Sequence, residues 1–528
     1  MIRVACFVVA GILSASPVVV ADLPPIESVA IRDRAFHVNG EPLLPIMIWL
    51  QDAENFPAAR ACHMNTVAGY WPTSSGTKDV TEYLALVREA GLYGVMPFHE
   101  GLKGRPALLG YIHGDEPDLP HQVSDAEIVP ADHLRINRKT PLWKLVDGVT
   151  HSWSVLDPMK GAEVTIRPKE PVTAVRLAVH LTVSKGLAVA KTVLFEADGK
   201  QVLEATLEKK KGRQAFDLAR PVTFKALTLK VTATYPGEHV WGSMGEVEAF
   251  NREGENVLLA RPRLEPRTEP EVVLKEYEAI QAHDPSRPVF MTVTGNFHPH
   301  FEKYAEDRRK RLYPAYVRAA DVVGYDIYPI YGWNKPEWIH LVHDATERLA
   351  AMAGDRPVYA WIETSRGGQW TGDLARQKKV TPRHIRAEVW MALTGGATAV
   401  GYFTHVWKPS YKQFGVPEEN RKALAEINAR LARLAPAILG KRIEGKATAA
   451  EAGVKVDAVF RARGGARYVF AVNYDERLTG TGVTFTVPGL ADGAAVEVID
   501  EDRTLRAAGG RFTDRFDPLA VHLYRVKR

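Results

Sequence analysis

LLGYIHGDEPD, residues Leu108–Asp118, runs from an apolar, β-rich segment directly into carboxylates. A second segment has the same form, because the apolar run Pro357–Ala360 leads into WIET at Trp361–Thr364. Polar residues at the carboxyl ends of buried strands are typical of a β/α barrel, where active residues occupy that position. The two peptides therefore predict a fold class, and they identify Glu116 and Glu363 as the first candidate site residues.

The rest of the chain repeats this strand pattern, and helical patterns fall between most of the strands. Examples of the helical patterns are Val80–Ala90, Val272–Ala282, Trp338–Ala351 and Pro382–Leu393. Strands that alternate with helices predict a parallel sheet, and eight such units close into an α/β fold, the (β/α)8 or TIM barrel. The eight predicted strands are Leu44–Trp49, Met64–Tyr70, Tyr93–Phe98, Leu108–His113, Val289–Thr294, Val322–Tyr328, Val358–Ile362 and Ala397–Phe403.

The sequence between the fourth and fifth predicted strands is far longer than an ordinary connection. It alternates in the manner of strands, as in Ala174–Val179 and Ala226–Val231, with turn signals such as Ala197–Lys200. This pattern predicts a β-sandwich inserted after strand four. Without the insert, the strand–helix pattern has the length of a typical barrel, about 250 residues.

A helical, Ala-rich stretch at Lys422–Leu439 is followed by β patterns to the end of the chain, which predict a C-terminal antiparallel β-sandwich. The domains predicted from these patterns are a signal peptide at 1–21, a barrel at 22–118 and 268–439, an inserted sandwich at 119–267 and a terminal sandwich at 440–528.

Composition excludes several classes of protein. Of the 528 residues, 46% are hydrophobic and 25% are charged, as in ordinary globular proteins, and the net charge of +5 implies no nucleic-acid partner. Arg3, the apolar stretch Val4–Val20 and the small residues before Asp22 predict a cleaved secretory signal and a secreted or periplasmic protein, with no stable membrane insertion. Cys62 is then the one remaining cysteine, which predicts a small buried residue and no internal disulfide.

The strand-end glutamates resemble those of the retaining glycoside hydrolases of the large barrel clan that includes cellulases and β-galactosidases. In that clan the acid/base carboxylate follows strand four and the nucleophile ends strand seven, which corresponds to Glu116 and Glu363. AHDPSRPV at Ala282–Val289 and RAEVWMALTGGATAVGYF at Arg386–Phe403 are also similar to the clan, so the resemblance spans the barrel through short motifs.

This resemblance implies a double-displacement mechanism. Glu363 would attack the anomeric carbon, and Glu116 would protonate the departing oxygen and then activate water, with the carboxyls about 5–5.5 Å apart. The clan has Asn before the acid/base, whereas this chain has Asp115. Asp115 can still accept a bond from a sugar hydroxyl, and its charge is expected to help keep Glu116 protonated.

Other strand-end residues would suit a saccharide, because sugar rings pack on aromatic planes while their hydroxyls bond polar groups. Core packing near the rim is the alternative for each of them. An oligo- or polysaccharide substrate is expected, with exo action favoured by the long insert. The further candidates for substrate binding are Trp49, Trp71, His99, Glu100, Tyr325, Asp326, Trp361, His405 and Trp407.

The insert resembles the discoidin-like, galactose-binding modules, through LVDG at Leu145–Gly148 with Trp153, and WGSMGEVE at Trp241–Glu248. Those modules often hold a structural calcium, which makes Asp147 and Glu246 candidate ligands by this likeness. The module would bind glycan or form a wall of the active site.

Two alternatives to a retaining hydrolase stay open. One is an inactive carbohydrate-binding protein on the same scaffold, and the other is a barrel hydrolase that uses Glu100 or Asp326. No phosphate loop, haem motif or nucleotide fingerprint stands out, so no catalytic cofactor is expected. The oligomeric state is open.

Overall fold

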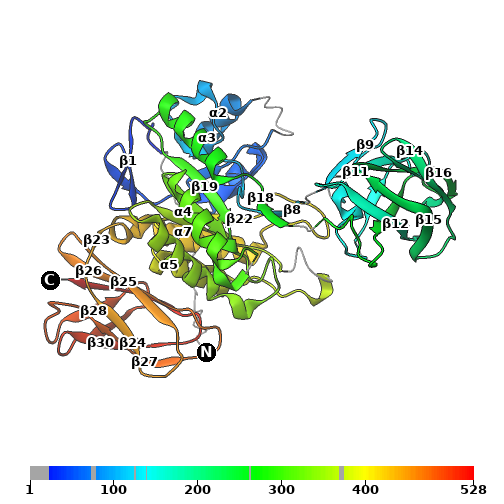
Figure 1. Cartoon of the computed structure of the whole chain (residues 1–528). Helices are drawn as coiled ribbons and strands as arrows, with labels where there is room; N and C mark the ends of the chain where they lie inside the picture. Colours follow the sequence, from blue (N-terminus) through cyan, green and yellow to red (C-terminus); the bar gives the residue numbers. More distant parts are fainter. Residues whose placement is uncertain are drawn as a thin grey trace, which may run out of the picture. The chain divides into compact units, whose positions relative to one another are not determined.

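The computed structural model describes residues 23–72, 79–123, 126–137, 140–150, 152–260, 263–301, 303–367 and 374–527. The predicted signal peptide at 1–21 lies outside these ranges. Within them, no helix combines the length and the apolar character that crossing a membrane requires. The chain divides into two compact units, one made of Met1–Leu119 with Arg267–Arg528 and the other of Pro120–Pro266 (Figure 1).

Eight parallel strands close into a barrel, as predicted, and each predicted strand overlaps one of them. The barrel closes where β7 pairs with β19, with Tyr111 opposite Val289, although unit Pro120–Pro266 separates these two strands in the chain. In barrel order the strands are β19 (Val289–Thr294), β20 (Val322–Asp326), β21 (Val358–Glu363), β22 (Ala399–Phe403), β4 (Ile46–Trp49), β5 (Thr66–Ala68), β6 (Tyr93–Met96) and β7 (Leu108–Ile112).

Helices connect most of these strands, and the four predicted helices are present with small shifts at their ends. Asp79 caps α2 by accepting bonds from two backbone N–H groups, and Thr381 caps α6. Between β6 and β7 only a 3₁₀ turn, η2 (Glu100–Leu102), is found. The helices are α1 (Phe56–Ala61), α2 (Val80–Glu89), α3 (Pro270–His283), α4 (Glu306–Arg318), α5 (Leu341–Ala353), α6 (Pro382–Thr394) and α7 (Glu418–Ile438).

Large aromatic side chains fill the barrel interior, and glycines on neighbouring strands make room for them. The Tyr359 hydroxyl bonds Thr292 across the barrel at 2.8 Å. A β-carbon at Gly324 would lie 2.0 Å from the Tyr359 ring, so the neighbouring strand requires glycine there. Because residues on a strand alternate between two faces, Asp326 points to the same side as Gly324, into the barrel.

Unit Pro120–Pro266 is an antiparallel β-sandwich with a continuous apolar core. Its first and last strands, β8 (Pro120–Val123) and β18 (Arg263–Pro266), pair with each other. One sheet contains β10 (Ser154–Leu156), β17 (Gly242–Phe250), β12 (Val172–Leu181) and β15 (Gly212–Phe224). The other contains β14 (Lys200–Thr206), β13 (Val189–Ala197), β16 (Leu227–Tyr235), β11 (Glu163–Arg167) and β9 (Glu127–Pro130).

The C-terminal part folds into two antiparallel sheets that pack on the barrel through α6, where Trp390 meets Phe470 with ring centroids 5.4 Å apart. One sheet contains β23 (Lys441–Arg442), β25 (Val456–Arg463), β26 (Ala466–Asn473), β31 (Val521–Lys527), β28 (Ala495–Val498) and β29 (Arg503–Arg506). The other contains β24 (Lys446–Ala449), β27 (Gly480–Thr486) and β30 (Arg511–Phe516), and a separate N-terminal sheet contains β1 (Val29–Arg32), β2 (Ala35–Val38) and β3 (Glu41–Leu43).

Candidate active site

Three carboxylates meet at the carboxyl end of the barrel. Asp115 and Glu116 follow β7, and Asp326 ends β20 and points into the barrel. The carboxyls of Glu116 and Asp326 lie in hydrogen-bond contact, and Asp115 lies close enough to both to interact electrostatically. We call Asp115, Glu116 and Asp326 the carboxylate cluster.

Two ionised carboxylates in contact repel each other, so a proton within the carboxylate cluster would relieve this repulsion. Burial raises the pKa of Asp326 well above its usual range, and Glu116 and Asp115 raise it further. The Oδ1 atom of Asp326 is buried and has no hydrogen-bond donor in the part of the chain that the structure describes. A proton shared with Glu116 satisfies both observations.

Asp115 lies at the open side of the carboxylate cluster. Solvent reaches its side chain, but the surrounding barrel mouth displaces much of its water and raises its pKa to about 7, with Glu116 contributing. Arg267 offsets part of this charge: its guanidinium donates to the Asp115 carbonyl oxygen at 2.5 Å and lies 3.9 Å from the Glu116 carboxylate. The cluster therefore keeps one cation beside three acids.

Asp118, which is fully buried, anchors the backbone that follows Asp115 and Glu116. Its carboxylate accepts bonds from Thr294 and from the Tyr313 hydroxyl at 2.8 Å, and burial raises its pKa to about 6. Glu116 has a φ of +48°, which residues with a β-carbon seldom adopt and which costs roughly 1–3 kcal/mol. The anchored Asp118 helps to hold Glu116 in this conformation.

Glu363 ends β21 but is fully enclosed, in a second carboxyl pair. The backbone N–H groups of Ile330 and Tyr331 donate to its carboxylate at 3.0 and 2.5 Å. The other face meets Glu388 of α6, which is also fully buried. Burial raises the pKa of Glu363 to about 7 and that of Glu388 well above its usual range. Among the described contacts, none joins Glu363 to Glu116.

Three of the predicted substrate-binding residues lie in the barrel wall or interior. Tyr325 is fully buried, and its hydroxyl donates to the Val342 carbonyl oxygen of α5 at 2.6 Å, so it faces away from the barrel interior. Trp49 and Trp361 pack against each other with ring centroids 5.2 Å apart, and both are buried. We assign Tyr325 to the wall and correct its predicted role, because strand alternation turns it away from Asp326.

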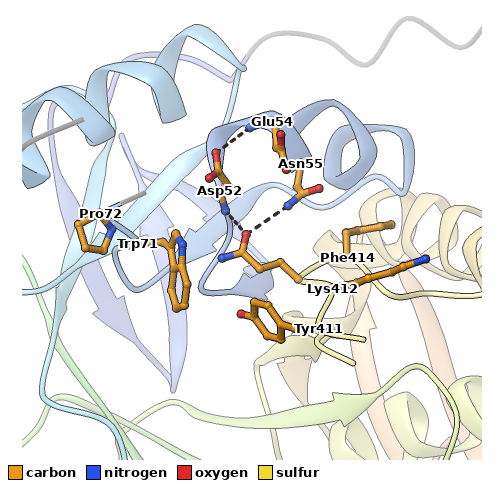
Figure 2. Close-up of a pocket in the computed structure, with 9 residues that line it drawn as sticks. Asp52, Glu54, Asn55, Trp71, Pro72, Tyr411, Lys412 and Phe414 are labelled. Carbon is orange, nitrogen blue, oxygen red and sulfur yellow. Dashed lines mark hydrogen bonds between the residues drawn. The ribbon is translucent and has the colours of Figure 1, made fainter. Parts of the chain in front are cut away.

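A group of aromatic residues lies on another arc of the same rim. His405 is buried and bonds the Leu50 carbonyl oxygen at 2.8 Å, while Trp407 is 46% exposed. Trp407 stacks on Tyr411 with centroids 4.8 Å apart, and Trp71 lies 6.4 Å from the Tyr411 ring (Figure 2). The structure thus brings together three predicted binding residues, His405, Trp407 and Trp71, around Tyr411.

His99 and Glu100 are exposed at the start of η2. His99 accepts a bond from the Gly101 N–H at 3.1 Å and so caps this turn. Within the described residues, Glu100 makes no contact with the carboxylate cluster. Of the two alternative carboxylates, Glu100 and Asp326, the structure therefore favours Asp326.

In the separate unit, Asp147 and Glu246 form a further carboxyl pair. Their carboxyls are in hydrogen-bond contact, and burial together with Asp147 raises the pKa of Glu246 to about 9. A proton or a cation between them would relieve the repulsion. The described residues contain no group of three or more His, Cys, Asp or Glu suited to a metal, so a calcium ion here would need backbone carbonyls or water as further ligands.

Sequence reasoning missed Arg267, Glu388 and Tyr411. Arg267 is separated from Glu116 by the whole inserted unit, so no local pattern joins them. Glu388 had a usable signal, because it falls on the helix face shared by the buried residues Ile385 and Ala392. A carboxylate on an apolar face needs a partner.

No family model and no curated protein matches the chain. Among solved structures, an α-amylase from Geobacillus thermoleovorans in complex with acarbose is 13% identical, covers 50% of this chain and 58% of its own length, and has a TM-score of 0.35. A family 32 carbohydrate-binding module of NanJ from Clostridium perfringens, in complex with galactose, is 11% identical, covers 24% of this chain and 97% of its own length, and has a TM-score of 0.21.

Two such modules of ZmpB from Clostridium perfringens, in complex with GalNAc, are 14% identical and have a TM-score of 0.21. They cover 26% of this chain, which spans 40% of their length. These likenesses to solved structures are partial, and each covers at most half of the chain.

Proposed function

We propose that this chain is a glycoside hydrolase of the secreted or periplasmic space, with Glu116 as the acid/base residue. The observation that supports it is the contact between Glu116 and Asp326 at the carboxyl end of the barrel. A group that protonates a glycosidic oxygen must hold a proton near neutral pH, and two carboxyls that share one proton meet this need.

Each residue of the carboxylate cluster then has a role. Glu116 donates its proton to the departing oxygen and later removes one from water, so it returns to its starting state. Asp326 shares this proton and positions Glu116. Asp115 faces the solvent side, where its carboxyl can accept a bond from a sugar hydroxyl.

Glu363 is the proposed nucleophile of a double displacement. Two backbone N–H bonds favour its ionised form, and a protonated Glu388 would leave the charge on Glu363. Because Glu363 is fully enclosed, attack on a sugar requires the segment that carries Ile330 and Tyr331 to move aside. If that movement does not occur, Asp326 and Asp115 are the remaining carboxylates of the cluster.

The test compares wild type with Glu116→Gln and Glu363→Ala on aryl glycosides and on plant, algal and bacterial polysaccharides. Glu116→Gln is expected to lower kcat on polysaccharides by about 10²–10⁴-fold, whereas kcat/KM on aryl glycosides, whose leaving group needs no proton, is expected to fall much less. Glu363→Ala is expected to lose about 10³-fold or more and to regain turnover with azide.

The outcomes separate the alternatives. Turnover that is indifferent to Glu363→Ala would remove Glu363 as nucleophile and move that role to another carboxylate. Indifference to Glu116→Gln would contradict the proposal itself. Saccharide binding without turnover in wild type would favour an inactive binding protein. The product pattern distinguishes exo action, which releases one small product, from endo action.

A further inference from the structure

We infer that a second saccharide subsite, apart from the carboxylate cluster, lies between the loops that follow β4, β5 and β22. This inference rests on the proposed function and assigns the site an oligosaccharide of several sugar units. A cavity of about 770 Å³ lies there, and we call it the aromatic pocket (Figure 2). Its lining residues are Asp52, Glu54, Asn55, Trp71, Pro72, Tyr411, Lys412, Gln413 and Phe414.

The aromatic pocket lies on the same face of the barrel as the carboxylate cluster but on a different arc. All its lining residues follow the carboxyl ends of β4, β5 or β22, which are neighbours in the barrel. The cluster follows β7 and β20, and β6 and β21 separate the two groups of strands. The two sites share no residue.

Exposed aromatic faces are the first argument for a sugar. Tyr411 is 41% exposed although it stacks on Trp407, and Trp71 lies beside it with a ring tilt of 31°. Leaving such rings in water forgoes the free energy of burying them. With ring centroids 6.4 Å apart, no sugar fits between Trp71 and Tyr411, and Trp407 already stacks on Tyr411, so a sugar ring would stack on the outer face of Trp71.

A fixed polar edge is the second argument. Gln413 is 91% buried, and its Oε1 accepts a bond from the Asp52 N–H at 2.6 Å and from Asn55 Nδ2 at 3.3 Å (Figure 2). The Gln413 carbonyl oxygen accepts a bond from the Thr404 hydroxyl at 2.7 Å. The two bonds to Oε1 join the loop after β4 to the loop after β22, and the Thr404 bond holds the second loop, so the pocket is formed before a ligand arrives, which lowers the cost of binding.

The loop that carries Tyr411 is also rigid in itself. Val406 and Lys412 exchange two backbone hydrogen bonds of 2.8 Å, which close a hairpin with Trp407 on it. An aromatic platform with hydrogen-bonding groups at its edge suits a neutral sugar ring, whose C–H face is apolar and whose rim carries hydroxyls.

The experiment measures binding of cellohexaose, mannohexaose, xylohexaose and galactohexaose, and of the matching disaccharides, by calorimetry. The Glu116→Gln background slows hydrolysis during the measurement. We expect one hexasaccharide to bind more tightly than its disaccharide. Trp71→Ala and Tyr411→Ala are each expected to weaken hexasaccharide binding by about tenfold, whereas Tyr411→Phe keeps the ring and most of the affinity.

Leu478→Ala is the control, because Leu478 is 43% exposed on the C-terminal part, far along the chain from the pocket. Unchanged hexasaccharide affinity in Trp71→Ala and Tyr411→Ala would overturn the subsite, and so would the absence of binding to all four hexasaccharides. Neither result touches the proposed function, which the hydrolysis screen decides separately. Thermal unfolding of each variant shows whether a lost affinity is a lost fold.

Discussion

Asp326 shows how one side chain can set the protonation of another. Its carboxyl touches Glu116, and both lie in a mouth that contains a third acid, Asp115. The proton shared by such a pair is released at a higher pH than that of a single carboxyl, because the second ionisation places two negative charges in contact.

Replacement of Asp326 by asparagine is therefore expected to move the basic limb of the kcat/KM profile toward lower pH. Asp326→Asn removes the carboxyl that shares a proton within the carboxylate cluster, so at pH 8 the rate is expected to fall by about tenfold or more. Profiles for wild type and Asp326→Asn between pH 4 and 9 test this. Asp355→Asn, at an exposed carboxylate between α5 and β21, is the matched control and should leave the limb in place. A parallel loss at every pH would contradict the shared proton.

Among the elements, α6 is the helix whose role the sequence described least well. Its apolar stripe and its Thr381 cap made it predictable as a helix, and the eight strands were predictable because short apolar runs ended in polar residues. Which strand-end residues meet was harder to foresee. Trp361 and Glu363 are two residues apart and so lie on the same face of β21. Trp361 packs against Trp49, whereas Glu363 is enclosed with Glu388 of α6.

The Glu363–Glu388 pair predicts a pH-dependent stability. Folding raises the pKa of both groups, so the fold favours their protonated forms, and stability falls as pH rises above about 4.3 toward the raised pKa values, about 7 for Glu363. Glu388→Gln removes one ionisable group and keeps a donor for Glu363. Its Tm relative to wild type is expected to rise by about 2 °C or more between pH 5 and pH 8.

Thermal unfolding across that pH range measures the effect. The exposed Glu426 of α7 supplies the control, because Glu426→Gln removes the same charge at the surface. A Tm difference between Glu388→Gln and wild type that is constant with pH would rule out a titrating pair.

At the scale of the whole molecule, the chain carries two units with separate cores. The change from strand–helix alternation to pure strand alternation near Pro120 made the inserted sandwich predictable. Whether this sandwich binds a metal was less predictable, because the carboxyl pair of Asp147 and Glu246 has the same sequence pattern whether it holds a proton or a metal.

We propose, as the likeness to discoidin-like modules implies, that this pair holds calcium. Millimolar calcium is then expected to raise the Tm of one unfolding transition and EDTA to lower it. A calcium concentration 100-fold above Kd would supply about 2.7 kcal/mol. Glu246→Gln should abolish the shift, and magnesium is the control cation. No response to calcium in wild type would leave a proton between the two carboxyls.

The place where the two units join has a consequence for how such a chain evolves. The Arg267 N–H donates to the Leu119 carbonyl oxygen at 3.0 Å, and Pro120 pairs with Pro266, so the chain leaves and re-enters the barrel at adjacent points. A gene segment can be gained, lost or exchanged at such a junction without altering the distance that the flanking strands must bridge. Recombination at this junction would give barrels that keep their chemistry and acquire a different accessory domain.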